Sequence, residues 1–311
     1  MYCILSRFKH AVYVQLKQLT IRESRHETGK QRLGKRINRC RYFAGSLPAT
    51  RVAVADFSPI FLTSARATIA ALLGLFFLVL LRQARPTASN IPALAVSALG
   101  VVIGFPLLTA LALQHVSSAH SIVFLGLLPI STAIFAVLRG GERPKPLFWL
   151  FSVLGAIFVA GYAALGETST AWKGDLYMLA AIILCGLGYA EGAKLSRTLG
   201  GWQVISWALL LSLPVMLPIA LWSMPVSFQN VSTAAWIGLA YVSVFSMLLG
   251  FVFWYRGLAQ GGIASVGQLQ LFQPFMGLAL AALLLHESVS CMMLVVTLAA
   301  IICVAGARKY V

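Results

Sequence analysis

The chain has 311 residues, of which 59% are hydrophobic and only 10% are charged, and its mean hydropathy is +0.87. Soluble domains carry roughly a quarter charged residues, so this composition excludes a compact water-soluble body and predicts a membrane protein. The net charge of +16 does not indicate nucleic-acid binding, because 11 of the 24 Lys and Arg residues lie in residues 1–41 and most others lie in short turns between apolar runs.

The basic residues 1–41 are interpreted as a disordered N-terminal tail or as a misassigned start, with a short helix on the membrane surface as an alternative. The apolar piece 42–57 is too short to cross a membrane and contains Pro48 and Arg51. Beyond it, we expect nine helices, each near the roughly 20 residues that span the hydrocarbon layer. They lie at 59–81, 91–113, 117–138, 147–164, 174–194, 202–222, 233–256, 262–285 and 290–307.

The basic residues in the turns predict the orientation of these helices. Successive turns between the predicted helices lie on opposite sides of the membrane. When the turns after residue 59 are assigned in this way, one side holds only Lys173. The other side holds Arg82, Arg85, Arg139, Arg143, Lys145, Lys194, Arg197, Arg256, Arg308 and Lys309. Basic turns stay on the cytoplasmic side, so we expect a multi-pass protein of the bacterial inner membrane with its C-terminus in the cytoplasm.

One unusual pattern occurs twice in the chain. Pro129 precedes Glu142 by 13 positions, and Pro274 precedes Glu287 by the same 13, with 145 positions between the two copies. A shift of 141 also aligns 42–57 with the helix at 174–194. The short piece is therefore interpreted as the second half of an incomplete first helix. Each copy then holds five helices, and because five is odd, the second copy must lie upside down relative to the first, as in many secondary transporters.

The Pro129–Glu142 unit, the Pro274–Glu287 unit, Arg66 in the second helix and the five-plus-five layout resemble the EamA branch of the drug/metabolite transporter superfamily. The resemblance covers about residues 42–308. It implies an all-α membrane protein, a ten-helix inverted-repeat bundle around a central cavity, with the first helix incomplete.

This resemblance also implies a domain organisation and a function. Residues 1–41 would be the tail, 42–165 the first EamA-type repeat and 174–308 the second. The chain would be a secondary transporter, an exporter of small metabolites, amino-acid-like solutes or drugs, working by alternating access without a cofactor. Its expected partners are the small solute and the lipid bilayer, with proton coupling and a homodimer left open and no nucleic acid.

Polar residues inside the predicted helices are the candidate binding residues. Gln270 and Gln273 share one helix face and are candidates for substrate hydrogen bonds, with interhelical hydrogen bonds as the alternative. Arg66 is a candidate for a substrate carboxylate, with pairing to Asp56 or a carbonyl as the alternative. Glu191 is the candidate for proton coupling, and an ion pair with Lys194 is the alternative.

Aromatic residues and prolines complete the candidate site. Trp207, Trp254 and Tyr189 are candidates for lining the cavity, although aromatic residues near helix ends commonly belong to the membrane interface. Pro129 and Pro274 are candidate gating hinges, with ordinary helix kinks as the alternative.

The sequence leaves two other classes of function as alternatives. A membrane-embedded enzyme would need a motif such as HExxH or GxSxG, and neither occurs. A non-transporting truncated membrane protein is the remaining alternative, because the first helix is incomplete. No metal site is predicted: His115 and His120 are five positions apart, which does not place them on one helix face.

The orientation can be tested with a single cysteine. Position 288 lies in a predicted outer turn, so Ser288→Cys should react with a membrane-impermeant thiol reagent added from outside the cell. The same protein without the introduced cysteine serves as the control for background labelling. Labelling from the cytoplasmic side alone would show that the orientation is reversed.

Overall fold

The structure, a computed structural model, describes residues 43, 45–164, 171–267, 270, 272–307 and 310, and the regular elements in these residues are helices. The first half comprises α3 (Ser46–Ala53), α4 (Pro59–Leu80), α5 (Ile91–Ser97), α6 (Phe105–Ala112), α7 (Ser118–Phe124), α8 (Leu128–Gly140) and α9 (Pro146–Ala164). The second half comprises α10 (Ala171–Ser196), α11 (Gly201–Trp222), α12 (Thr233–Tyr241), α13 (Phe251–Gly261), α14 (Ile263–Gly267), α15 (Phe272–Leu285) and α16 (Cys291–Ala307).

Several of these helices join into longer spans through short 3₁₀ or π segments. Six spans are long and apolar enough to cross a membrane: Pro59–Leu80, Ala88–Ala112, Ser118–Gly140, Trp172–Ser196, Gly201–Trp222 and Thr233–Gly261. Shorter apolar helices cover Pro146–Val159, Met276–Leu285 and Cys291–Ala307. The helix bounds follow the nine predicted runs closely, except that the run 262–285 is divided between α14 and α15. The predicted tail 1–41 lies outside the described residues, and the count of ten spans remains a prediction.

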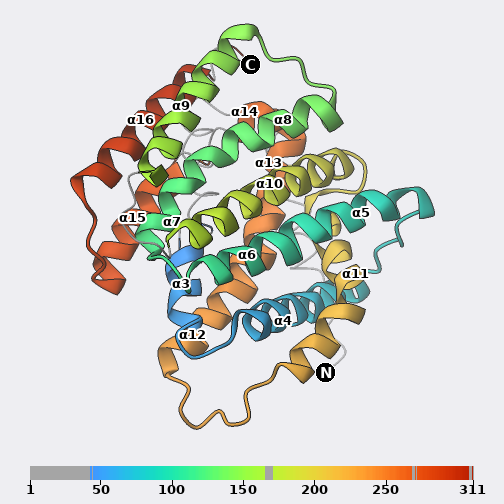
Figure 1. The fold of residues 1–311 in the computed structure, drawn as a ribbon. Coiled ribbons are helices and arrows are strands. Elements are labelled where there is room, and N and C mark those ends of the chain that lie inside the picture. Colours follow the sequence, from blue (N-terminus) through green and yellow to red (C-terminus); the bar gives the residue numbers. More distant parts are fainter. Residues whose placement is uncertain are drawn as a thin grey trace.

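The long helices pack in pairs that join the two halves (Figure 1). α4 packs along α11, α9 packs along α16, and α10 lies between α6 and α8. Glycines permit the closest of these approaches. A Cβ atom on Gly100 would lie 2.5 Å from the Leu184 carbonyl oxygen, and one on Gly188 would lie 3.1 Å from the Gly100 Cα. Small residues let membrane helices approach closely, so the "GLGYAEG" stretch of α10 is a packing surface.

Two π-helical segments occupy corresponding places in the two halves. η2 (Ala98–Gly104) joins α5 to α6, and η4 (Val242–Gly250) joins α12 to α13. Their first residues are 144 positions apart, close to the 145 that separates Pro129 from Pro274. π segments are uncommon and often lie at functional sites. The second one carries Ser246, which contributes to the candidate site described below.

The turns that carry Glu142 and Glu287 have the same backbone structure. Gly141 and His286, which precede these glutamates, both have positive φ angles, of 69° and 51°. The Glu142 amide donates to the Ala136 carbonyl at 3.1 Å, and the Glu287 amide donates to the Ala281 carbonyl at 3.3 Å. This is the left-handed ending by which many helices satisfy their last carbonyl groups.

Each of these glutamates caps a helix of the other half. The Glu142 carboxylate accepts from the Ile263 and Ala264 amides, at 2.8 and 2.9 Å, at the start of α14. The Glu287 carboxylate accepts from the Ser118 and Ala119 amides, at 3.1 and 2.8 Å, and from the Ser118 hydroxyl at 2.7 Å, at the start of α7. The end of the α7–α8 segment therefore lies at the start of the α14–α15 segment, and the end of α14–α15 lies at the start of α7–α8. The two segments run antiparallel.

The reciprocal caps should contribute to stability. Glu142→Ala or Glu287→Ala removes the acceptor for two amides at a helix start, and an unpaired buried donor costs about 1–3 kcal/mol. We expect each variant to unfold at a lower temperature in detergent than the parent protein.

The matched control for this experiment is Lys173→Ala, which removes an exposed charge near the start of α10. Unfolding temperatures that do not differ between the glutamate variants and this control would contradict the structural role of the caps.

Candidate functional site

Arg66 lies at the centre of a buried polar group contributed by three helical segments. Its side chain is 5% exposed, and its Nη2 donates to the Ser246 Oγ at 3.4 Å. The Ser246 hydroxyl also shares a 2.7 Å hydrogen bond with the Ser46 hydroxyl of α3. The Arg66 Nε has no hydrogen-bond partner among the described residues. Among the described residues, this guanidinium with five donors is therefore held by one long hydrogen bond, to a neutral hydroxyl.

Aromatic rings of three other segments pack together around Phe43, which lies three residues before Ser46. The Phe43 ring packs edge-on against Trp254 and Phe251 of α13, with ring centroids 6.2 and 5.3 Å apart. Tyr189 of α10 contacts the same Trp254 ring, with centroids 5.5 Å apart. The Gln273 Nε2 of α15 donates to the Phe43 carbonyl at 3.3 Å.

The predicted binding residues thus meet only in part. Phe43 contacts Trp254 and Gln273, and Trp254 contacts Tyr189. The Ser46–Ser246 bond joins Arg66 to α3. Gln270 is buried, and its Oε1 has no partner among the described residues. Trp207 of α11 is half-buried against the core. The central cavity that the sequence predicts remains a prediction.

Arg66 does not pair with Asp56, one of the alternatives drawn from the sequence. The Asp56 carboxylate instead accepts from the Ser232 amide and hydroxyl, at 2.8 and 2.5 Å, at the start of α12. These hydrogen bonds hold the pKa of Asp56 below its ordinary value. Asp56 therefore stabilises a turn at one end of the bundle, and no carboxylate of the described residues pairs with Arg66.

Glu191 forms an ion pair, although not with the residue expected from the sequence. Its side chain is 2% exposed and accepts from the Arg139 Nε of α8, while Lys194 is exposed. Helical spacing favoured Lys194, but the close packing of α10 on α8 brings Arg139 to the carboxylate instead. An arginine keeps its charge at physiological pH, so this pair is better suited to holding α8 against α10 than to exchanging protons.

The two prolines lie in the first turns of helices and not in their interiors. Pro129 is the second residue of α8 and follows the 3₁₀ turn η3 (Leu125–Leu127). Pro274 is the third residue of α15. A proline in the first turn of an α-helix removes no hydrogen bond within that helix, although Pro129 lies inside the longer span Ser118–Gly140. Both still mark the junction between two helical segments, which keeps them as hinge candidates.

Two pockets lie away from the Arg66 group. An apolar groove of about 450 Å³ runs between α3, α12 and α15, lined by residues such as Ala49, Ile237 and Leu284. A more polar pocket of about 350 Å³ lies where α10 ends and α11 begins, next to Arg197, Gln203 and Arg256. Neither pocket is lined by the residues that the sequence predicts for substrate binding.

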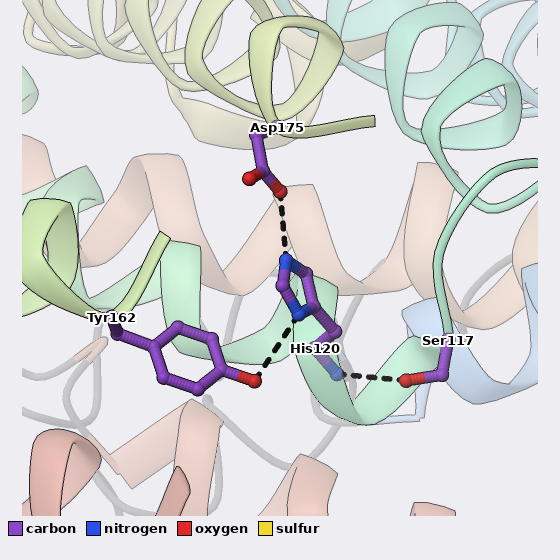
Figure 2. A network of polar contacts seen from close by, with 4 residues as sticks. All are labelled: Ser117, His120, Tyr162 and Asp175. Carbon is purple, nitrogen blue, oxygen red and sulfur yellow. Dashed lines mark hydrogen bonds and ion pairs between the residues drawn. The ribbon is translucent and has the colours of Figure 1, made fainter. Parts of the chain in front are cut away.

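A further polar network, not expected from the sequence, joins α7, α9 and α10 (Figure 2). The His120 Nε2 lies 2.7 Å from the Asp175 Oδ1, and its Nδ1 lies 3.1 Å from the Tyr162 hydroxyl. The His120 amide donates to the Ser117 hydroxyl. Sequence reasoning tested His120 only as a metal ligand with His115, which instead stacks on Tyr177. The available signal was Asp175, a rare acidic residue inside an apolar run.

The described acidic residues have one property in common. The chain has eight, of which Glu23, Glu27 and Glu167 lie outside the described residues. The other five each bond a residue of the opposite half: Asp56 to Ser232, Glu142 to Ile263, Asp175 to His120, Glu191 to Arg139 and Glu287 to Ser118. These carboxylates therefore join the halves at both ends of the bundle.

Comparison with known proteins assigns the family. The model of the EamA-like transporter family matches residues 40–163 and again residues 172–308. The uncharacterized transporter YdeK of Bacillus subtilis is 62% identical over 268 residues, covering 86% of this chain and 93% of that protein. A probable terminal-alkyne amino-acid exporter of Streptantibioticus cattleyicolor is 23% identical over 252 residues, covering 79% of this chain and 82% of that one.

One solved crystal structure, described without a function, has the same fold. It is 17% identical, superposes with a TM-score of 0.65, and the match covers 88% of this chain and 96% of that one. The helical architecture and the two family matches agree with the sequence resemblance. The chain is a multi-pass membrane protein that belongs to the EamA-like transporter family.

The Arg139–Glu191 pair can be tested by removing one partner or both. Arg139→Leu leaves a buried carboxylate without its partner, and we expect a loss of about 3 kcal/mol of stability, the low end for a buried pair because the Arg139 side chain is 54% exposed. The double variant Arg139→Leu/Glu191→Leu should recover most of this loss, as read from unfolding in detergent. The single variants for comparison are Arg139→Leu and Glu191→Leu. A double variant less stable than both of them would show that the pair does not act as a unit.

Proposed function

We propose that this protein is a secondary transporter that exports small amino-acid-like solutes, related metabolites or drugs across the inner membrane by alternating access. The observation that carries the proposal is the reciprocal capping by Glu142 and Glu287. It relates two equivalent segments, α7–α8 and α14–α15, as antiparallel copies. Inverted copies of this kind let each half of a transporter adopt the conformation of the other.

The caps also suggest how the two ends would open. We call the end of the bundle with the start of α7 and the Glu287 turn the α7 end, and the end with the start of α14 and the Glu142 turn the α14 end. Opening the α7 end would release Glu287 from Ser118 and Ala119, and opening the α14 end would release Glu142 from Ile263 and Ala264. When a glutamate leaves its helix start, the freed backbone amides need hydrogen bonds from water. The contact can therefore break only at the end that is open to water.

The Arg66 group is the proposed solute site. A guanidinium that is 5% exposed and has no carboxylate partner among the described residues is electrostatically unsatisfied, and a solute carboxylate would satisfy it. The nearby Trp254 and Phe43 rings suit an apolar solute side chain, and Gln273 suits a polar group. The amino-acid exporter among the relatives supports the same class of solute.

The transport proposal can be tested with purified protein in liposomes, with and without a proton gradient. A panel of amino acids with apolar side chains is compared with the corresponding amides, which lack the carboxylate. Uptake of the acids with little uptake of the amides would support both transport and the role of Arg66. Equal uptake of both would leave transport standing but remove Arg66 from carboxylate recognition. Uptake of neither would favour the non-transporting alternative.

Substitution of Gln273 tests the site directly. Gln273→Leu should lower uptake roughly five- to tenfold, because one hydrogen bond to the solute is worth about 1 kcal/mol or more. Its abundance in the membrane should not change, because leucine suits a buried helix face. The matched control is Gln260→Leu, since Gln260 is an exposed glutamine at the end of α13. Uptake equal to that of the control would remove Gln273 from the solute site.

A further inference from the structure

The His120 ring lies at the α7 end and bonds groups on two other helices. The ring lies between Asp175 of α10 and Tyr162 of α9, and its own helix, α7, is capped by Glu287 (Figure 2). The side chains of His120 and Asp175 are 13% and 15% exposed, so both are largely buried but still reachable by water. The ring thus joins the fourth predicted helix of one half to the first predicted helix of the other.

The network suits either charge state of the imidazole. In the neutral form, the Nε2–H donates to Asp175, and the Tyr162 hydroxyl donates to Nδ1. In the cation, the Nε2–H still donates to Asp175, and the Nδ1–H donates to the Tyr162 oxygen. One proton is gained, the tyrosine hydroxyl turns, and both contacts are kept. The ring can therefore take up a proton without moving its neighbours.

The charges at the two ends of the bundle favour proton uptake at the α7 end. At the α14 end, Arg197 lies 3.7 Å from Glu142 and Arg139 pairs with Glu191, so arginine balances both carboxylates. At the α7 end, no lysine or arginine of the described residues forms an ion pair with Asp175 or Glu287. With a neutral imidazole, the His120–Asp175 pair keeps a net negative charge in a largely buried place, and a bound proton neutralises it.

We propose that His120, with Asp175 and Tyr162, is a proton-binding site at the α7 end, and that its proton strengthens the contact between α7 and α10 and so favours closure of that end. Imidazole is the side chain that ordinarily changes charge between about pH 5 and pH 8. The effect on transport rests on the proposed function, whereas proton binding does not. Glu191, the candidate drawn from the sequence, is tied to Arg139 and is not needed for this role.

Other titratable groups surround this site, and few of them contact the ring. In the described residues, the elements packed around α7 bring the following groups to the vicinity of the α7 end: Lys173, Asp175 and Tyr177 of α10, Tyr162 of α9, His115 after α6, His286 and Glu287 after α15, Arg51 of α3 and Cys291 of α16. Arg51 donates to the Leu113 carbonyl, and Tyr177 stacks on His115. Asp175 and Tyr162 bond the ring directly, while Glu287 acts through the start of α7.

The first test measures proton binding without transport. The imidazole signals of the full-length protein in detergent are followed by NMR as pH is varied, and the His120 signal is identified by its loss in His120→Gln. We expect this signal to change position as the ring takes up a proton. We also expect Tyr162→Phe, which removes the hydroxyl beside Nδ1, to alter that change. A His120 signal that keeps one position throughout the pH series would overturn the proposal, whatever the transport assay shows.

The second test measures the pH dependence of uptake in liposomes. His120→Gln keeps a donor for Asp175 but cannot take up the proton, so it should flatten the pH profile of the wild-type protein over the same pH series. The matched control is His115→Gln, because His115 is an exposed histidine in the preceding turn. This control should keep the wild-type profile. A His120→Gln profile identical to that of the control would overturn the role of this site in transport, while absence of uptake in the wild type would count against the proposed function alone.

Discussion

The fold depends on carboxylates that must find partners in a mostly apolar protein. A charged side chain in a membrane bundle is costly unless another group satisfies it. All five acidic residues in the described parts of the chain find that partner across the boundary between the halves. Three of them accept hydrogen bonds from backbone amides at helix starts, where the helix dipole favours negative charge. The other two pair with basic side chains. The halves are therefore joined by polar contacts at their ends, while close small-residue packing and aromatic rings hold their middles.

The two ends of the bundle use the same backbone device but different cations. Glu142 and Glu287 follow turns of the same shape and cap equivalent helices, yet an arginine lies beside the first and an imidazole lies near the second. An arginine does not respond to pH, whereas an imidazole does. A chain with twofold similarity in its backbone can thus have ends that respond differently to the solution around them.

Much of this arrangement was predictable from the sequence, and the reasons for the failures are physical. Apolar runs located the helices, since length and hydropathy dominate in a membrane. The repeated Pro–Glu spacing revealed the internal symmetry, and the EamA resemblance is confirmed by the family match. Partners across helices were not predictable: Glu191 bonds Arg139 and not Lys194, and Asp56 bonds Ser232 and not Arg66. Sequence spacing describes neighbours along one helix, while these contacts depend on how separate helices pack. The His120 network was missed for the same reason, because its three members come from three helices.

The reciprocal caps also bear on how such a chain arose. The start of α7 is capped by a glutamate of the second half, and the start of α14 is capped by a glutamate of the first half. The first half alone, ending near residue 164, would therefore leave the amides at the start of α7 without this acceptor. Two such polypeptides lying in opposite directions in one bilayer would complete each other, because Glu142 and Glu287 hold equivalent places. An ancestor of half this length, inserted both ways up, satisfies the same chemistry before any gene fusion. A single chain that carries both copies lets each copy differ from the other, and here an arginine lies at one end and an imidazole at the other.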